Sequence, residues 1–107
     1  MQKGTSVAVK LLMTWDVRAG QEALYSNFVL QELMPGLGKL GVRPIEAWYT
    51  VYGDAPQILA SVEAEDMRVM ERVLRSEEWQ RLKGRLLNYV TNYRQKVVQS
   101  TGRFQLP

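Results

Sequence analysis

The side chains in this sequence that could do chemistry are concentrated in two runs of β-branched and aromatic residues between Ile45 and Ala64. The runs flank Gly53-Asp54-Ala55-Pro56, which is typical of a four-residue hairpin turn. Pairing Tyr52 with Gln57 places apolar or aromatic residues opposite one another on one face: Val51 with Ile58, Tyr49 with Ala60, Ala47 with Val62, and Ile45 with Ala64. A shift by one residue would oppose apolar and polar side chains, so the pattern predicts this register.

The second face of the predicted hairpin is polar enough to form a site. It pairs Tyr52 with Gln57, Thr50 with Leu59, Trp48 with Ser61, and Glu46 with Glu63. Two carboxylates directly opposite each other repel, which raises the pKa of one of them unless a cation lies between them. Lys10, on a neighbouring predicted strand, is the candidate cation.

We interpret Lys10, Glu46 and Glu63 as candidate catalytic residues. A carboxyl with a raised pKa would act as general base, Lys10 would bind an enolate or phenolate oxygen, and Trp48 and Tyr52 would stack a planar substrate. The candidate ligand-binding residues on this face are Leu12, Trp48, Thr50, Tyr52, Leu59 and Ser61. The structural alternative is a Lys-Glu pair that neutralises itself across a dimer interface, with Glu46 at a solvated rim and the aromatics packed between the copies.

The 107 residues include no His and no Cys. Their absence excludes Ser-His-Asp and Cys-His catalysis, haem chemistry with an axial His, disulfides and Cys-type zinc sites. We therefore predict no metal and no cofactor. No apolar run approaches the roughly 20 residues that span a bilayer, and the first residues lack the apolar core of a signal peptide. The expected location is cytoplasmic, without membrane contact.

The charge pattern admits two interpretations. The net charge is +3, and nine of the fourteen basic residues lie between Arg68 and Arg103, which could indicate a patch for nucleic acid. However, Glu71 precedes Arg75 and Glu77 precedes Arg81 at the i,i+4 spacing of exposed helical ion pairs. We therefore favour a solvated helix surface.

Hydrophobic periodicity predicts the elements that must position these side chains. Residues 6–15 alternate as a strand, with one apolar side formed by Val7, Val9, Leu11, Met13 and Trp15. A helix is expected from about residue 20 to Met34, with an apolar stripe of Leu24, Tyr25, Phe28, Val29 and Leu33. Pro35, Gly36, Gly38 and Gly41 then predict a loop. Pro44, at the start of the second strand, indicates an edge strand.

A second helical region is expected after the hairpin. Glu65 and Asp66 favour its start, and its buried side comprises Met67, Met70, Val73 and Leu74. Ser76 predicts a break near residues 75–77 and caps a further stripe of Trp79, Leu82, Leu86, Tyr89 and Val90. Residues 92–99 could continue the helix, but Thr91, Val97, Val98 and Thr101 favour a fourth strand.

The order β-α-β-β-α-β predicts a ferredoxin-like α+β fold over a single domain, residues 1–107. Right-handed crossovers give the strand order 4-1-3-2 with both helices on one face, covering Val7, Val9, Leu11, Met13, Tyr49, Val51, Ile58, Ala60 and Val62. The opposite face is too apolar for a lone domain, so we expect a homodimer in which two sheets face each other, close a barrel and enclose a cavity.

Two segments resemble a known family. The predicted arrangement resembles the dimeric α/β-barrel superfamily. Trp48-Tyr49-Thr50-Val51-Tyr52-Gly53-Asp54 and Ser76-Glu77-Glu78-Trp79 resemble its NIPSNAP-type branch, over about residues 6–98. The superfamily includes the antibiotic-biosynthesis monooxygenases and several groups of haem proteins. Because this sequence has no His, haem is not implied here, and the NIPSNAP-like proteins provide no catalytic residues to transfer.

Three functions follow as hypotheses. The first is a homodimer that binds a small hydrophobic or aromatic molecule. The second is a cofactor-independent monooxygenase or isomerase similar to the antibiotic-biosynthesis group. The third is an RNA-binding module, which is disfavoured because such modules need stacking aromatics on the two central strands, where this chain has Lys10, Leu12, Leu59, Ser61 and Glu63.

Overall fold

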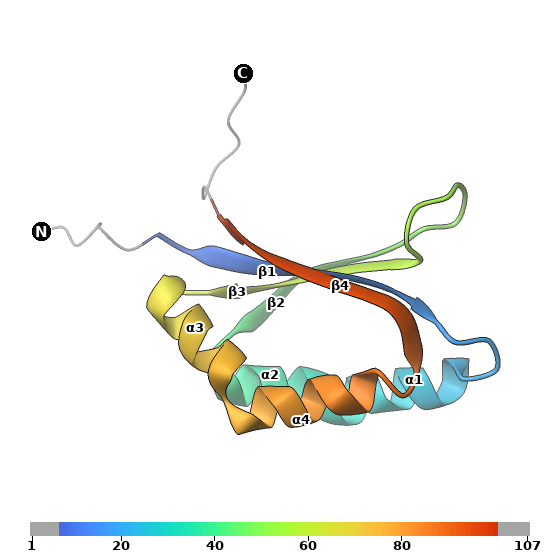
Figure 1. Cartoon of the computed structure of the whole chain (residues 1–107), viewed down its shortest axis with the longest axis horizontal. Helices are drawn as coiled ribbons and strands as arrows, with labels where there is room; N and C mark the ends of the chain where they lie inside the picture. The colour runs from blue at the N-terminus through green and yellow to red at the C-terminus, as the bar shows by residue number, and fades with distance from the viewer. Residues whose placement is uncertain (1–6, 101–107) are drawn as a thin grey trace, which may run out of the picture.

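The computed structural model describes residues 7–100, so Ser6, Thr101 and Arg103 lie outside the described residues. It consists of a four-stranded antiparallel sheet with a layer of helices on one face (Figure 1). The strand order β2-β3-β1-β4 confirms the predicted ferredoxin-like α+β arrangement. The elements are β1 (Val9–Val17), α1 (Glu22–Phe28), the π turn η1 (Val29–Leu33), α2 (Met34–Leu40), β2 (Arg43–Tyr49), β3 (Ile58–Ala64), α3 (Met67–Arg75), α4 (Glu77–Leu86) and β4 (Val90–Gln99).

The core lies between the sheet and the helices. Alternate residues of the central strand β1 are buried there, as its period of two predicts: Val9, Leu11, Met13 and Trp15. The helices contribute Phe28, Leu33, Leu37, Met70, Val73, Trp79, Leu82 and Leu86. None of the helices within residues 7–100 combines the length and apolar character needed to cross a membrane.

The first helical region runs further than predicted. It continues through Pro35, Gly36 and Gly38 to Leu40 and ends at Gly41, whose φ of 101° suits glycine. The π turn η1 ends two residues before Pro35, and this change in hydrogen-bond register accommodates a residue that has no N–H to donate. The prediction of a loop at these residues was therefore wrong. Leu24, expected in the buried stripe, is exposed.

Close packing explains one of these glycines. A Cβ added to Gly36 would lie 2.7 Å from Leu82 Cδ1, so the glycine allows α2 and α4 to approach each other. Nothing lies within 4 Å of a Cβ added to Gly38. Only Gly36 is thus required by packing.

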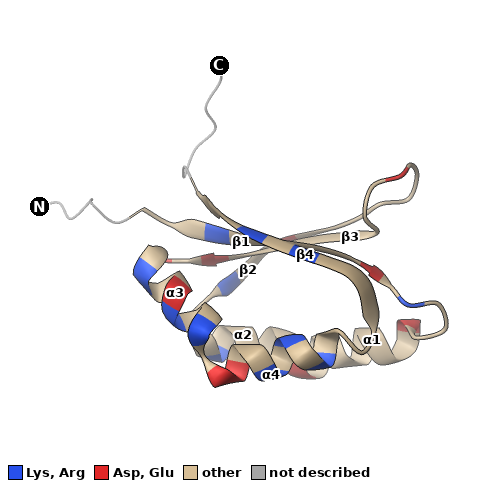
Figure 2. Cartoon of the chain, in the orientation of Figure 1, with Lys and Arg blue, Asp and Glu red and all other residues tan. Residues whose placement is uncertain are grey.

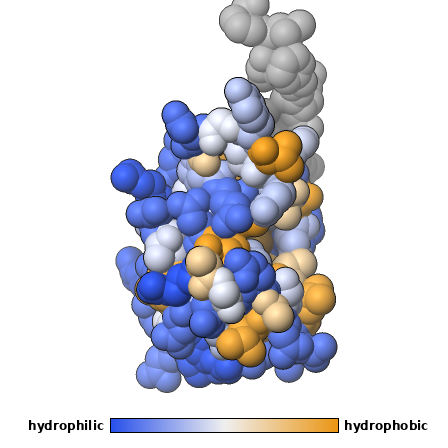
Figure 3. Space-filling view, turned by 90° about the vertical axis from the view of Figure 1, so that its right-hand side faces the viewer, coloured by the Kyte–Doolittle hydropathy of each residue, from blue (hydrophilic) through white to orange (hydrophobic). Residues whose placement is uncertain are grey.

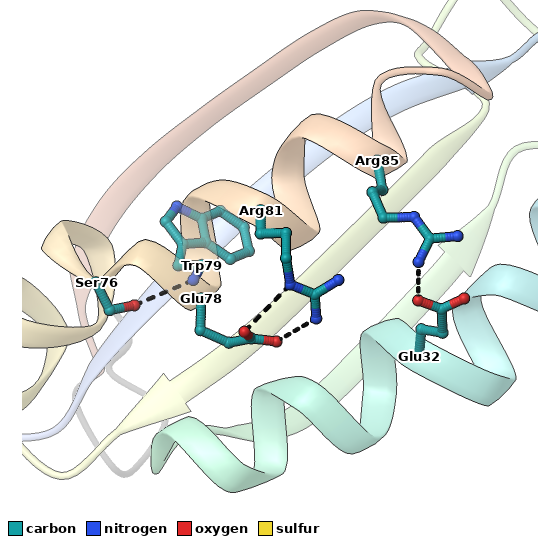
Figure 4. Close-up of polar contacts among 6 residues, drawn as sticks. All are labelled: Glu32, Ser76, Glu78, Trp79, Arg81 and Arg85. Carbon is teal, nitrogen blue, oxygen red and sulfur yellow. Dashed lines mark hydrogen bonds and ion pairs between the residues drawn. The ribbon is translucent and has the colours of Figure 1, made fainter.

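The predicted break between α3 and α4 is confirmed (Figure 4). The Asp66 carboxylate accepts a hydrogen bond from the Val69 N–H at 2.9 Å and caps α3. The Ser76 hydroxyl accepts one from the Trp79 N–H at 3.1 Å and caps α4. Met67, at the start of α3, was expected to be buried but is exposed.

The helix ion pairs differ from those predicted. Arg81 pairs with Glu78 rather than with Glu77, and Arg85 reaches Glu32 of η1, which ties α4 to the first helical region (Figure 4). Within residues 7–100, Glu71 and Arg75 form no ion pair. An i,i+4 spacing allows a pair to form, whereas the neighbouring helix decides which carboxylate each arginine reaches.

The chain after α4 forms a strand, as favoured. Val90, expected on the helix stripe, is the first residue of β4. The β1–β4 register shifts between Thr14 and Asp16, opposite Asn92, which has a φ of 57°. This β-bulge bends β4 toward the helices and places the Tyr93 ring parallel to Trp15, with 6.0 Å between the ring centroids.

The register of the hairpin differs from the prediction by two residues. Ile58 faces Tyr49 instead of Val51, and Ala60 faces Ala47 instead of Tyr49. A second bulge, at Ile45, places Pro44 opposite Val62 and Arg43 opposite Glu63. The reason is a longer loop, because Thr50 and Gln57, and not Tyr52 and Gln57, are the last residues joined by a backbone hydrogen bond.

This shift leaves the end of the hairpin outside the core. Tyr49 and Val51 were expected under the helices, but both are exposed, Val51 by 85%. The loop projects away from the helix layer (Figure 1), and every residue of the edge strand β2 is exposed. Pro44 on this strand agrees with the predicted edge position.

Candidate functional site

The sheet face away from the helices, here called the open face, holds most of the predicted site residues. The strand registers place Lys10 opposite Glu63, Leu12 opposite Ser61, and Trp48 opposite Leu59. Trp48 is 63% exposed, so this face is uncovered in a single copy. Thr50 and Tyr52 are not on a strand, and Tyr52 is 94% exposed in the hairpin loop. The structure therefore brings the strand residues together and leaves Tyr52 apart.

The predicted pairing of two carboxylates is wrong. Glu46 faces Ser61, two residues along β3 from Glu63. Glu63 instead forms an ion pair with Arg43, a residue that the predicted register did not place in the site. The direct repulsion between Glu46 and Glu63 does not arise in this register, although Lys10 does lie directly across from Glu63 on β1.

Ser61 is a buried polar residue whose place in the register is on the open face and which also lines the cavity described below. Its side chain is 1% exposed, and its hydroxyl oxygen has no hydrogen-bond partner among the described residues. A buried hydroxyl without a partner is unfavourable, because it has lost its hydrogen bonds to water.

A cavity on the other face of the sheet was missed by the sequence analysis. It has a volume of about 260 Å³ and lies between the β2–β3 side of the sheet and the α1–η1–α2 segment. Its lining is almost entirely apolar or aromatic and comprises Met13, Trp15, Tyr25, Val29, Leu33, Met34, Leu37, Pro44, Ile45, Glu46, Ala47, Ile58, Ala60, Ser61 and Val62.

The sequence contains a signal for this cavity. Ala47 and Ala60 face each other across β2 and β3, and two small side chains leave space that larger ones would fill. The predicted register set Ala60 against Tyr49 and so concealed the space. The bulge at Ile45 adds a residue at the cavity wall.

Two aromatic residues provide a hydrogen-bond donor at the cavity wall. The Trp15 indole N–H donates a hydrogen bond to the Tyr25 hydroxyl oxygen at 3.1 Å, and the rings meet edge to face with 6.4 Å between their centroids. Because its oxygen already accepts from Trp15, the Tyr25 hydroxyl is left to donate. Burial raises the pKa of Tyr25 above its ordinary value, which keeps this donor protonated.

Neighbouring aromatics hold Trp15 in place. Tyr93 of β4 stacks on Trp15, with an angle of 7° between the two ring planes. Burial also raises the pKa of Tyr93, whose hydroxyl donates to Gln95 at 2.8 Å. The Lys83 ammonium lies 5.2 Å from the centre of the Tyr93 ring.

The ionisable groups at the cavity are few. Among its lining residues, the ionisable ones are Tyr25 and Glu46, whose place in the register directs its side chain to the open face, and none is a cation. Within residues 7–100, no three acidic side chains lie close enough together to hold a metal ion. The cavity is thus suited to neutral, largely apolar molecules that carry a hydrogen-bond acceptor.

Solved structures with this fold come from several bacteria. A NIPSNAP family protein from Agrobacterium tumefaciens is 15% identical, with a TM-score of 0.66 over 94% of this chain and 92% of its own. An ethyl tert-butyl ether D (EthD) family protein from Bacillus halodurans is 12% identical, with a TM-score of 0.70 over 87% of this chain and 98% of its own.

A protein from Bacteroides fragilis, described as dimeric, of unknown function and with a ferredoxin-like fold, is 15% identical, with a TM-score of 0.63 over 87% of this chain and 96% of its own. No protein-family model matches the sequence, and no curated protein does. The chain therefore has the ferredoxin-like fold seen in solved NIPSNAP family proteins, as its sequence signatures indicated.

Proposed function

We propose that this protein binds a small, neutral aromatic molecule in the cavity between the sheet and the α1–η1–α2 segment, and that it does so as a homodimer joined through the open face. The cavity carries the proposal, because its volume of about 260 Å³ and its apolar lining fit a compound of one or two rings. An engineered cavity of about 150 Å³ holds benzene, and typical ligand pockets begin near 300 Å³.

The Tyr25 hydroxyl gives the proposed ligand its polar feature. A donor that is fixed by Trp15 at 3.1 Å favours a ligand with a carbonyl or ether oxygen. With Glu46 at the wall and no cation among the lining residues, an anionic ligand would find no partner. The homodimer is supported by the apolar exposed residues of the open face and by the dimeric structure from Bacteroides fragilis.

The experiment compares two matched compounds, the bicyclic ketone 1-tetralone and the hydrocarbon tetralin, by isothermal titration calorimetry. We expect the ketone to bind about 2- to 12-fold more tightly, as one neutral hydrogen bond provides. Tyr25→Phe should remove this preference and leave tetralin binding unchanged. Equal binding of both compounds by the wild type would contradict the role of Tyr25, and binding of neither would contradict the cavity.

A second candidate function uses the open face. Lys10 faces Glu63 across the two central strands, so a cofactor-independent monooxygenase or isomerase could use Lys10 to bind a substrate anion and a nearby carboxylate as base. On a substrate that is turned over, Lys10→Ala and Glu63→Gln should each abolish activity while the dimer persists. Full activity in both variants would eliminate this mechanism.

A further inference from the structure

The open face carries a cluster of cations that the helix-side cavity does not explain. Lys10 of β1 and Arg94 and Lys96 of β4 lie on it, because they share cross-strand rows with Val98, Thr14 and Leu12 respectively. Figure 2 shows basic segments on both strands where these run side by side. None of these three cations forms an ion pair within residues 7–100.

The spacing of the three cations is that of a single site. Arg94 and Lys96 are two residues apart on one strand, roughly 7 Å. Lys10 is the diagonal cross-strand neighbour of Lys96, at about 7–8 Å. Few carboxylates can neutralise these cations, because Glu63 already pairs with Arg43, and β2, which carries Glu46, is separated from β4 by two strands.

The surface beside Arg94 and Lys96 is partly apolar. A shallow hollow of about 490 Å³ is lined by Leu12, Thr14 and Leu59 together with Arg94, Gln95 and Lys96. Leu59 is an exposed residue of β3, and Leu12 is half-buried on β1. An apolar floor with cations at one side complements a molecule that has an apolar body and an anionic head.

Pairing two copies through this face would increase the need for a bound anion. The proposed homodimer would bring the three cations of each copy together in a region removed from water. Burying charges of like sign without counter-charges is strongly unfavourable. A bound anion in each copy would remove that penalty, and its apolar body would cover Leu12 and Leu59.

We infer that the open face binds a small soluble carboxylate with an apolar body, held by Arg94, Lys96 and Lys10, and that this ligand stabilises the homodimer. The inference rests on the proposed homodimer but not on the ligand proposed for the helix-side cavity. The two sites differ in chemistry, because the cavity has no cation among its lining residues, whereas the open face has three that form no ion pair within residues 7–100.

The experiment measures the dimer dissociation constant by sedimentation equilibrium at low ionic strength. The probes are octanoate and its neutral counterpart 1-octanol, at equal millimolar concentrations. We expect octanoate to tighten the dimer by at least about tenfold through binding linkage, with no such effect of octanol. Arg94→Gln and Lys96→Gln should each reduce the effect of octanoate. Arg72→Gln, which removes an exposed arginine of α3, should leave it unchanged.

Each other outcome has a distinct meaning. An equally tight dimer with and without octanoate would overturn the inference and leave the homodimer standing. Monomers under all conditions would overturn both, while tetralone binding would still test the cavity separately. If Arg72→Gln reduced the effect of octanoate as much as Arg94→Gln does, the effect would depend on the net charge of the protein and not on this site, and the inference would be overturned. Tight binding to phosphatidylglycerol vesicles without any response to octanoate would make a membrane surface the occupant and overturn the inference.

Discussion

Asp16 connects three segments that are far apart in the sequence. Its carboxylate accepts hydrogen bonds from the Asn92 side-chain amide at 2.9 Å and from the Gln57 N–H at 2.8 Å. The Gln57 side-chain oxygen in turn accepts from the Val17 N–H at 2.7 Å. The end of β1 is thereby joined to the hairpin and to the bulge of β4. The hydrogen bond from Asn92, followed by that from Gln57, lowers the pKa of Asp16 below its ordinary 3.8.

This pKa predicts a pH dependence of folding stability. A carboxyl whose pKa is lower in the folded than in the unfolded state stabilises the fold above its unfolded pKa. That contribution is lost as the pH falls through the lowered pKa of the folded state. Urea unfolding from about pH 5 downward should therefore show a steeper loss of stability in the wild type than in Asp16→Asn. Asp54→Asn, in the exposed hairpin loop, should behave like the wild type, and the same slope in Asp16→Asn would contradict this role.

Replacing each of two serines by alanine should affect the free energy of unfolding differently. The Ser76 hydroxyl caps α4, so Ser76→Ala should lower the free energy of unfolding by about 1 kcal/mol. The Ser61 hydroxyl is buried without a partner among the described residues. Ser61→Ala should therefore leave that free energy unchanged or raise it by up to about 1 kcal/mol. Urea denaturation of both variants checks the contrast. A loss of stability in Ser61→Ala would mean that this hydroxyl has a partner, such as an ordered water.

At the scale of the elements, the α1–η1–α2 segment forms one wall of the cavity and packs against α4. Its contact with α4 depends on Gly36, whereas the cavity wall uses Val29, Leu33, Met34 and Leu37. A single helical region therefore provides both the stability of the layer and the shape of the site.

Two glycines of α2 provide a matched test. Gly36→Ala should lower the free energy of unfolding by about 1–3 kcal/mol, because the new methyl group would meet the buried Leu82 at 2.7 Å. Gly38→Ala should raise it by about 0.5–1 kcal/mol, since the helix favours alanine and the position is open. Thermal or urea unfolding distinguishes the two. Equal effects would mean that packing against α4 does not select glycine at position 36.

Local signals explain which elements were predictable. The alternation in β1, the Ser76 cap and the β-branched residues of β4 all act within a few residues, and each prediction was confirmed. Pro35 and the neighbouring glycines favour a loop on local grounds, but packing of Gly36 against Leu82 and the π turn before Pro35 overrode them.

The hairpin shows why the site was only partly predictable. A shift by two residues keeps each side chain on its face, so the hydrophobic pattern cannot distinguish the two registers. The longer loop and the bulge at Ile45 then replaced Glu46 with Arg43 as the neighbour of Glu63. Lys10 and Glu63, predicted on the same face of the two central strands, lie directly opposite each other because β1 and β3 pair without a bulge, but Glu63 forms its ion pair with Arg43.

At the scale of the whole molecule, the two faces of the sheet differ. One face is covered by helices (Figure 1), and the other carries the exposed apolar residues Trp48 and Leu59 together with basic residues of β1 and β4. Seen from the end at which the hairpin projects, the surface carries separate apolar patches among hydrophilic side chains (Figure 3). The exposed large apolar residues include Trp48, Tyr49, Val51 and Tyr52, which lie at or beyond the end of β2.

Salt should therefore strengthen the dimer in the absence of ligand. Raising the ionic strength from 0.01 to 0.15 M shortens the screening length from about 30 to about 8 Å, which weakens the repulsion between facing cations. Sedimentation equilibrium should show a lower dimer dissociation constant at the higher ionic strength, and a smaller change in Lys96→Gln. A dimer that weakens with salt would indicate an interface held by opposite charges.

The π turn has a consequence for comparing this chain with its relatives. Phe28 and Leu33, both buried, are five residues apart, which in a regular α-helix would separate them by about 140° around the axis. The turn absorbs one additional residue and returns Leu33 and Leu37 to the side of Phe28. A relative with an uninterrupted helix should therefore align with a one-residue gap between positions 28 and 34, and an ungapped alignment would pair the wrong cavity residues from there to the end of α2.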